Sequence, residues 1–157
     1  MDLALYQPEI PENTASLMRF AACLGLNLHL IEPLGFALNT KKMRRIAMDY
    51  RDQVALHRHA SFSDFQAALP ESRLVLATTT ATLPHWDHTW QAGDVLLMGQ
   101  ESCGVPAAIH RAAHVRITIP LHPSARSLNL ASAATLICGE WQRQRSRKND
   151  IPPYIPT

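Results

Sequence analysis

The sequence of 157 residues has few of the features that mark membrane or secreted proteins. No apolar run reaches the ~18 residues needed to cross a bilayer, and the N-terminus has no basic region followed by an apolar core. The three cysteines, Cys23, Cys103 and Cys138, are odd in number and widely spaced. This spacing is typical of reduced thiols rather than of a disulfide framework. We therefore expect a cytoplasmic protein that neither spans a membrane nor is secreted.

Motifs for nucleotide binding are also missing. No G-x-G-x-x-G follows a strand-like run and no G-x-x-x-x-G-K-[ST] occurs, which excludes the dinucleotide fingerprint and the P-loop. The run from Gly99 to Gly104 is one residue too long for a G-x-S-x-G nucleophile elbow. A hydrolase that uses Ser102 or Cys103 is therefore a weak hypothesis, because no pair of base and orienting residue accompanies them in the sequence.

Two histidine pairs, His57-x-His59 and His85-x-x-His88, have spacings that metal sites use. Neither pair has the cysteine pair or the nearby carboxylate cluster that would complete a tetrahedral zinc set. We expect no bound metal, and we interpret these histidines as surface residues or loop caps.

The net charge of +2 is too small to indicate a nucleic-acid-binding protein by itself, but its distribution is uneven. Eight of the 15 basic residues fall in two short stretches, Lys41, Lys42, Arg44 and Arg45, then Arg143, Arg145, Arg147 and Lys148. Such clusters can neutralise phosphates. A solvated helix face and a basic frayed tail are the more ordinary explanation.

Short β-rich runs alternate with helical patterns along the chain. The predicted strands are Leu3–Tyr6, Leu28–Ile31, Val54–His57, Leu74–Thr78, Val95–Met98 and Val115–Ile119. The predicted helices are Thr14–Leu24, Lys41–Ala47, Ser63–Leu69, Ala107–Ala113 and Leu128–Arg145. This alternation predicts an α/β fold with a mainly parallel sheet and helices on both faces. Residues 1–157 show no internal repeat or linker, so we expect a single domain in which residues 150–157 form an irregular tail.

Three loops at the ends of predicted strands carry unusual residues. The first is the stiff segment Pro8–Glu12, which is followed by Asn13 as a good helix N-cap. Arg19 is the only charge between Asn13 and Asn27 and lies off the apolar stripe of this helix. It suggests a cleft in which a guanidinium meets an anion, although a surface arginine with a carboxylate partner is an equally good explanation.

The second loop, Leu97–Pro106, follows a strand and precedes a helix, where open α/β sheets bind ligands. Gly99 and Gly104 permit a positive φ and close approach of a ligand to the backbone, and Glu101 can accept a hydrogen bond or orient a substrate group. A plain turn is the alternative. The third loop, Ile119–Asn129, leads into a long helix that begins with capping residues and is rich in small residues.

In residue type and order these loops resemble the three motifs of the SPOUT (α/β-knot) RNA methyltransferases. The resemblance is specifically to the TrmL-type branch, which methylates the ribose 2′-hydroxyl of cytidine or uridine 34 in tRNA. The matching segments are Tyr6–Thr14, Arg19, Ile31–Phe36, Arg44-Arg45, Met48–Tyr50, Gly99, Glu101, Gly104, Pro106 and Arg126–Leu130. They occur in order from about Leu3 to about Arg143, nearly the whole chain.

The resemblance implies a C-terminal trefoil knot, a homodimer, and S-adenosyl-L-methionine as a cofactor held largely by backbone groups. The implied cofactor contacts are Ala77, Gly99, Ile119, Ser127 and Leu128. The implied catalytic residues are Asn13, Arg19, Glu101, Ser127 and Asn129. The implied substrate is the anticodon loop of tRNA, whose backbone would be held by Lys41, Lys42, Arg44 and Arg45.

This chain departs from the family pattern at two positions in the second loop. Close relatives often carry a basic residue at the position of Cys103 and proline or arginine at that of Gln100. We expect these departures to affect substrate binding near this loop and not cofactor binding. A related methyltransferase acting on another tRNA or rRNA nucleotide is an alternative, because the three motifs serve chemistry common to the superfamily. A non-catalytic RNA-binding member is another, although all five implied catalytic residues are present.

Overall fold

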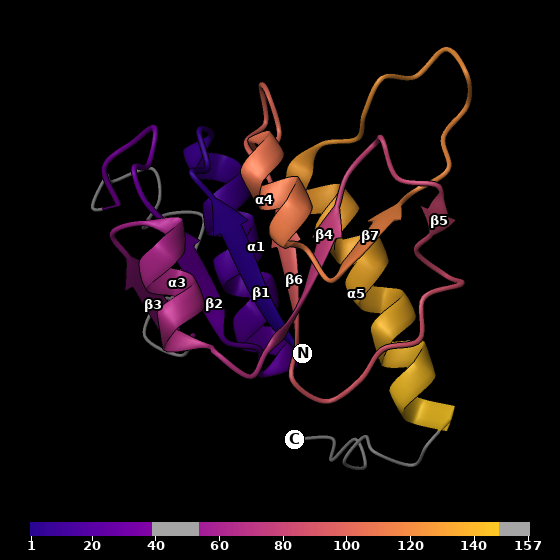
Figure 1. Cartoon of the computed structure of the whole chain (residues 1–157), viewed down its shortest axis with the longest axis horizontal. Coiled ribbons are helices and arrows are strands. Elements are labelled where there is room, and N and C mark those ends of the chain that lie inside the picture. The colour runs from indigo at the N-terminus through magenta and orange to yellow at the C-terminus, as the bar shows by residue number, and fades with distance from the viewer. Residues whose placement is uncertain (39–53, 148–157) are drawn as a thin grey trace.

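The computed structural model describes residues 1–38 and 54–147. In these residues, seven strands form one sheet with the order β3-β2-β1-β6-β4-β7-β5, and neighbouring strands are parallel (Figure 1). The strands are β1 (Asp2–Tyr6), β2 (Leu28–Ile31), β3 (Leu56–His59), β4 (Arg73–Ala77), β5 (Leu83–Pro84), β6 (Asp94–Met98) and β7 (Val115–Thr118). The helices are α1 (Pro11–Leu24), α3 (Phe62–Ala68), α4 (Ala107–Ala112) and α5 (Leu130–Arg147).

The alternation of side chains along the strands explains why both faces of the sheet are covered. Along β1, Leu3 and Leu5 belong to a core shared with α1 and α5, whereas Ala4 and Tyr6 belong to a core shared with α3 and α4. Figure 1 shows the same arrangement, with α3 and α4 in front of the sheet and α1 and α5 behind it. The predicted α/β fold with a parallel sheet and helices on both faces is confirmed. Among the described residues, no helix combines the length and the apolar character needed to span a bilayer.

The start of α1 differs from the prediction. The helix begins at Pro11 with Ile10 as its cap residue, so Asn13 lies inside the first turn and the prediction of Asn13 as the N-cap is wrong. Proline is well suited to the first turn because the N–H that it lacks would have no partner there. The long C-terminal helix likewise begins at Leu130, two residues later than predicted.

Two strands differ from the prediction by more than one residue at an end. β3 is Leu56–His59 rather than Val54–His57, because its pairing with β2 starts where Leu56 lies beside Leu28. β5 has only two residues, too few to leave a pattern in the sequence. The predicted helix Lys41–Ala47, the basic cluster within it and the tail at 150–157 lie outside the described residues. The single domain and the trefoil knot stay predictions.

The four histidines singled out in the sequence have different environments. His57 is exposed, but His59, His85 and His88 are buried, so their interpretation as surface residues is wrong. His59 Nε2 lies 3.0 Å from Nδ1 of the buried His29, whose ring stacks on that of His57. Within the described ranges, no group of three or more His, Cys, Asp or Glu side chains could hold a metal ion.

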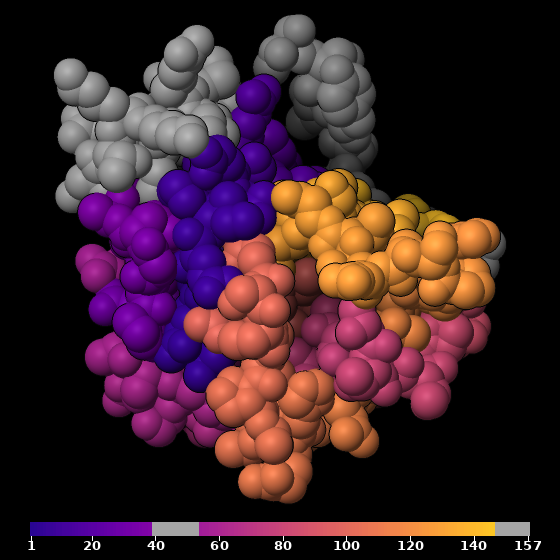
Figure 2. All heavy atoms as spheres, turned by 90° about the horizontal axis from the view of Figure 1, so that it is seen from above, coloured from indigo at the N-terminus to yellow at the C-terminus, as the bar shows by residue number. Residues whose placement is uncertain are grey.

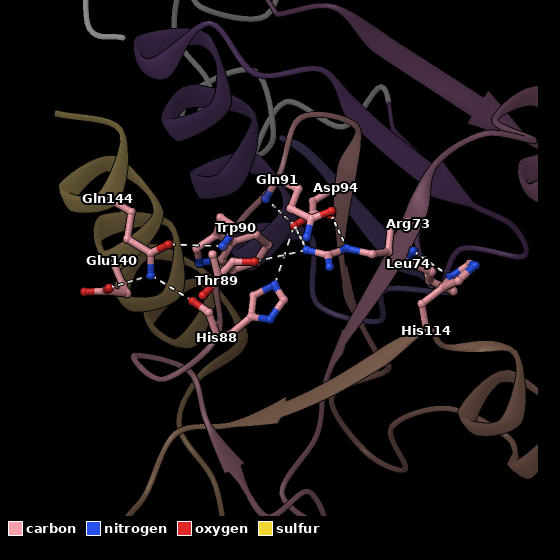
Figure 3. A network of polar contacts seen from close by, with 10 residues as sticks. All are labelled: Arg73, Leu74, His88, Thr89, Trp90, Gln91, Asp94, His114, Glu140 and Gln144. Atoms are coloured by element: carbon pink, nitrogen blue, oxygen red, sulfur yellow. Dashed lines mark hydrogen bonds and ion pairs between the residues drawn. The ribbon is translucent and has the colours of Figure 1, made fainter. Parts of the chain in front are cut away.

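A polar network at the N-terminal edge of the sheet holds α5 against the strands (Figure 3). Arg73 donates hydrogen bonds from Nε and Nη2 to the two carboxylate oxygens of the buried Asp94, at 2.7 and 2.8 Å. On α5, the side chain of Gln144 accepts a hydrogen bond from the Trp90 N–H at 3.0 Å and donates one to the His88 carbonyl at 2.8 Å. The loop between β5 and β6 is thereby tied both to the strands and to the C-terminal helix.

The Arg73–Asp94 pair makes stability depend on pH. Burial opposes ionisation of Asp94, but hydrogen bonds from Arg73 and the Gln91 N–H, with the charge of Arg73, outweigh it and lower the pKa of the carboxyl below its ordinary value of 3.8. A carboxyl whose pKa is lowered by folding stabilises the protein fully above its unfolded-state pKa. This contribution is lost as the pH falls through the folded-state pKa.

We expect Asp94→Asn to lower the free energy of unfolding at neutral pH by ~2–3 kcal/mol, because Arg73 loses its counter-charge in a partly buried site. The variant should also lose less stability than the parent on acidification below about pH 4. Urea denaturation at several pH values measures both effects, with the exposed Asp87→Asn as the matched control. An Asp94→Asn variant as stable as the parent at neutral pH would contradict this assignment.

Candidate active site

The loops that follow β4, β6 and β7 surround a cleft of about 640 Å³ at the C-terminal edge of the sheet. Figure 2 looks onto this edge and shows the hollow between the salmon surface of the loop after β6 and the orange surface of the segment before α5. Eight of the predicted site residues line the cleft, namely Asn13, Ala77, Gly99, Glu101, Ile119, Ser127, Leu128 and Asn129. Open parallel sheets bind ligands at this edge. Residues from distant segments of the sequence thus meet at one place.

A chain of side-chain hydrogen bonds joins three of the cleft segments. Asn13 Nδ2 donates to Glu101 Oε1 at 3.1 Å, and Asn129 Nδ2 donates to Asn13 Oδ1 at 2.7 Å. Asn129 Oδ1 in turn accepts the backbone N–H groups of Ala131 and Ser132, at 2.9 and 3.2 Å. Asn129 therefore caps the N-terminus of α5, and this cap is tied through Asn13 to the loop after β6.

Only one orientation of the two amides satisfies this chain. A carboxylate can only accept hydrogen bonds, and the first N–H groups of a helix can only donate them. The Asn13 amide must therefore turn its NH2 toward Glu101 and its oxygen toward Asn129, and Asn129 must turn its oxygen toward α5. Reversing either amide would place donor against donor or acceptor against acceptor. The chain thus has a fixed direction.

Glu101 also anchors the start of α1. Its carboxylate accepts the backbone N–H of Glu9 at 2.8 Å and that of Ile10, the cap residue of α1, at 3.3 Å. A negative charge at a helix N-terminus is favourable because the N–H groups there point outward. The expectation that Glu101 accepts a hydrogen bond is confirmed. Glu101 thus binds the two residues that precede α1, whereas no side chain caps the helix in the way predicted for Asn13.

The two glycines of the loop after β6 allow it to turn back on itself. Gly104 has a φ of +71°, and the backbones of Gln100 and Gly104 exchange two hydrogen bonds at 2.8 and 3.0 Å. A Cβ on Gly99 would lie 2.6 Å from the carbonyl carbon of Gly104, which no side chain could tolerate. Gly99 is therefore needed for the close contact of this loop with itself, and the predicted close approach of a ligand stays a prediction.

The two departures from the family pattern contact each other in the structure. Cys103 Sγ donates to Gln100 Oε1 at 2.7 Å, and Gln100 Nε2 donates to Gln7 Oε1 at 3.2 Å. Ser102, the other nucleophile considered, hydrogen-bonds through Oγ to Glu9 at 2.8 Å. Neither Ser102 nor Cys103 pairs with a histidine in the described part of the chain, so the geometry does not favour a hydrolase.

Several cleft residues were not predicted. Thr78, Thr79 and Thr80 line the cleft directly after β4, and the strand-end position could have identified them. Arg126 lies within a matching segment but had no assigned role. His110 reaches the cleft from α4, and no sequence signal points to it.

Arg19 is the predicted site residue that the fold does not bring to the cleft. It does not line the cleft, and its side chain is exposed on α1. Six residues separate it from Asn13, a turn of about 240° around a helix at 100° per residue, so the two side chains leave α1 in different directions. Arg19 therefore does not belong to this cleft within one subunit, and its predicted catalytic role stays a prediction.

The fold and the cleft define an α/β protein with a cleft at the strand ends of a parallel sheet, the place where such sheets bind ligands. A sequence model of the SpoU rRNA Methylase family matches residues 1–139. The chain therefore belongs to this family of RNA-methylating enzymes.

Similar proteins span nearly the whole of this chain. The tRNA (cytidine(34)-2′-O)-methyltransferase of Beijerinckia indica is 51% identical over 144 residues, which cover 90% of each chain. A solved structure described as giving insights into the 2-OH methylation of C/U34 on tRNA has a TM-score of 0.89 and 39% identity, and covers 93% of this chain and 96% of that one. The SpoU methyltransferase AviRb of Streptomyces viridochromogenes, in complex with AdoMet, has a TM-score of 0.85 and 25% identity over 93% of this chain and 58% of that one.

We expect Asn129→Ala to lower the free energy of unfolding by ~1–2 kcal/mol, because it removes both the cap of α5 and the hydrogen bond to Asn13. Asn129→Ser keeps a capping oxygen but has no NH2 group for Asn13, so it should recover about half of this loss. Urea denaturation of both variants measures the difference. Equal stabilities of the alanine and serine variants would show that Asn129 does not cap the helix.

Proposed function

We propose that this chain transfers a methyl group from S-adenosylmethionine to the ribose 2′-hydroxyl of nucleotide 34 in tRNA, a cytidine or a uridine. The observation that carries the proposal is the convergence of three motif segments on one cleft through the chain Glu101–Asn13–Asn129. The choice of substrate rests on the named relatives, which match nearly the whole sequence.

The cleft suits the cofactor in size and character. Its volume of about 640 Å³ lies within the range of small-molecule sites, and apolar side chains such as Met98 and Leu121 accompany hydroxyl and backbone groups in its lining. We assign the cofactor contacts to Ala77, Gly99, Ile119, Ser127 and Leu128, which all line the cleft. When bound, S-adenosylmethionine supplies a methyl group already activated by a positively charged sulfur.

The acceptor is a ribose hydroxyl, which is a poor acid, so its attack needs positioning and electrostatic help. Ser127 lines the cleft with an exposed side chain and can hydrogen-bond to the substrate ribose or phosphate. It lies two residues before Asn129, so the chain to Asn13 and Glu101 fixes its position relative to the loop after β6. Asn13, Glu101 and Asn129 thereby hold the catalytic segments in register.

Arg19 supplies charge in this proposal. A guanidinium stays protonated in proteins, so it acts as a clamp for a substrate phosphate and a stabiliser of the developing alkoxide rather than as a general base. Because Arg19 is exposed on α1 and does not line its own cleft, we propose a homodimer in which Arg19 of the partner subunit faces it.

The anticodon loop presents unstacked nucleotides, which suits an enzyme that must reach a ribose hydroxyl. We propose that the basic cluster holds the tRNA backbone, because clustered Lys and Arg side chains can neutralise phosphates. Its residues, Lys41, Lys42, Arg44 and Arg45, lie outside the described part of the structure. Contacts with phosphates would make tRNA binding weaken steeply as salt increases.

We expect Arg19→Ala to reduce methyl transfer by ~10²–10³-fold or more, because the charge that stabilises the alkoxide is lost. Affinity for S-adenosylmethionine, measured by calorimetry, should stay nearly unchanged. Arg19→Lys should lie between the alanine variant and the parent, since it keeps the charge but loses the bidentate fork. Arg58→Ala, an exposed arginine on β3, is the matched control. A large loss of cofactor affinity in Arg19→Ala would contradict this role.

The proposed acceptor can be tested with one substituted nucleotide. A tRNA whose nucleotide 34 is 2′-deoxy should accept no methyl group, whereas the same tRNA with 2′-deoxy at a neighbouring position should be methylated at the normal rate. Transfer of radiolabelled methyl from S-adenosylmethionine measures both. Undiminished transfer to the 2′-deoxy-34 tRNA would favour the alternative, a family member acting on another tRNA or rRNA nucleotide.

A further inference from the structure

Glu9, in the loop between β1 and α1, makes reciprocal hydrogen bonds with the loop after β6. Its backbone N–H donates to Glu101 Oε2 at 2.8 Å. Its carboxylate accepts the Ser102 N–H on Oε2 and the Ser102 hydroxyl on Oε1, both at 2.8 Å. The carboxylate of Glu9 therefore binds the loop after β6, and the carboxylate of Glu101 binds the loop between β1 and α1. Both Glu101 and Ser102 contact Glu9.

The opposite side of the Glu9 loop is also held. The Gly35 N–H donates to the Pro8 carbonyl at 3.0 Å. A Cβ on Gly35 would lie 2.8 Å from Glu9 Cα, so the two backbones are in close contact and the loop cannot move in that direction. Glu9 is thus placed between a fixed backbone and the loop that carries Glu101.

The carboxylates of Glu9 and Glu101 lie on adjoining loops, and each accepts hydrogen bonds from the other loop. Charge-assisted hydrogen bonds from N–H and O–H groups are about twice as strong as neutral ones. The Ser102 N–H and hydroxyl compensate Glu9, while the N–H groups of Glu9 and Ile10 compensate Glu101. Without the Glu9 carboxylate, the Ser102 N–H and hydroxyl would lose these two hydrogen bonds.

We propose that Glu9 is a positioning residue for methyl transfer. By holding Ser102 it sets the Glu101 carboxylate at the point from which Glu101 orients Asn13, and Asn13 orients Asn129. Glu9 itself does not line the cleft, so it acts through Glu101 and touches neither cofactor nor ribose. This inference rests on the proposed function for its catalytic readout.

The test compares Glu9→Gln, Ser102→Ala and the double variant with the parent, and uses the exposed Glu71→Gln as the matched control. Glutamine keeps one acceptor oxygen for the Ser102 N–H and can donate from its NH2 group to the Ser102 hydroxyl, but it carries no charge, so both charge-assisted hydrogen bonds are weakened. For each protein, the exchange rate of the Ser102 amide hydrogen, the Kd for S-adenosylmethionine, the thermal midpoint, and kcat and KM for tRNA are measured.

For Glu9→Gln we expect the Ser102 amide to exchange about tenfold faster and kcat to fall about tenfold. The Kd for S-adenosylmethionine should stay within about threefold of the parent, because only Gly99 of the proposed cofactor contacts lies on the loop that Glu9 holds. Ser102→Ala keeps the N–H bond and should lower kcat by about threefold. The double variant should be no slower than Glu9→Gln, because both changes break the same contact. Glu71→Gln should match the parent in every measurement.

Two results would overturn the proposal. One is a folded Glu9→Gln variant whose kcat stays within twofold of the parent although Ser102 exchange has accelerated. The other is an unchanged Ser102 exchange rate, which needs no RNA to measure and would show that the contact does not hold the loop. A loss of kcat matched by an equal loss of cofactor affinity would likewise point to general damage. Failure of the parent itself to methylate tRNA would reject the proposed function, and the exchange rates would still decide whether Glu9 holds Ser102.

Discussion

The chain Glu101–Asn13–Asn129 is the constraint on which the rest of the cleft depends. Asn13 is 88 residues from Glu101 and 116 residues from Asn129 in the sequence, yet it hydrogen-bonds to them at 3.1 and 2.7 Å. The carboxylate at one end and the first N–H groups of α5 at the other leave the two amides a single orientation. The loop after β6, the start of α1 and the start of α5 are therefore fixed relative to one another.

The parallel sheet makes this convergence possible. Because all strands run in the same direction, the loops after β4, β6 and β7 emerge at one edge, where they form the cleft. At the opposite edge, the Arg73–Asp94 pair and the hydrogen bonds of Gln144 hold the far part of α5 and the loop beside it. The helix is thus anchored near both ends, by a cap at the cleft and by a polar network away from it.

Much of the fold could be predicted because its signals are local. Runs such as Leu28–Ile31 are short, apolar and β-branched or bulky, and the structure has a strand at those residues. Gly104 was predicted to permit a positive φ, and it adopts one. Asn13 was wrongly predicted as the N-cap because asparagine is favoured at that position. Proline is also favoured in the first turn of a helix, and here α1 begins at Pro11. Once α1 begins earlier, the Asn13 side chain is free to bridge two other segments.

The parts that could not be predicted depend on long-range contacts. Glu9 looks like an ordinary loop residue until the fold places Ser102 against it, 93 residues away. His59 and His88 look like surface residues because their burial is decided by packing across strands and loops, not by their neighbours in sequence. Arg19 was expected in the cleft from its isolation on an apolar helix, but helical rotation directs it elsewhere.

Methylation of nucleotide 34 by this chain is tested most directly by mass spectrometry of tRNA nucleosides from cells with and without the gene that encodes it. We expect the 2′-O-methylated nucleoside at position 34 to disappear when the gene is absent and to return when it is restored. Unchanged ribose methylation at position 34 in cells without the gene would contradict it.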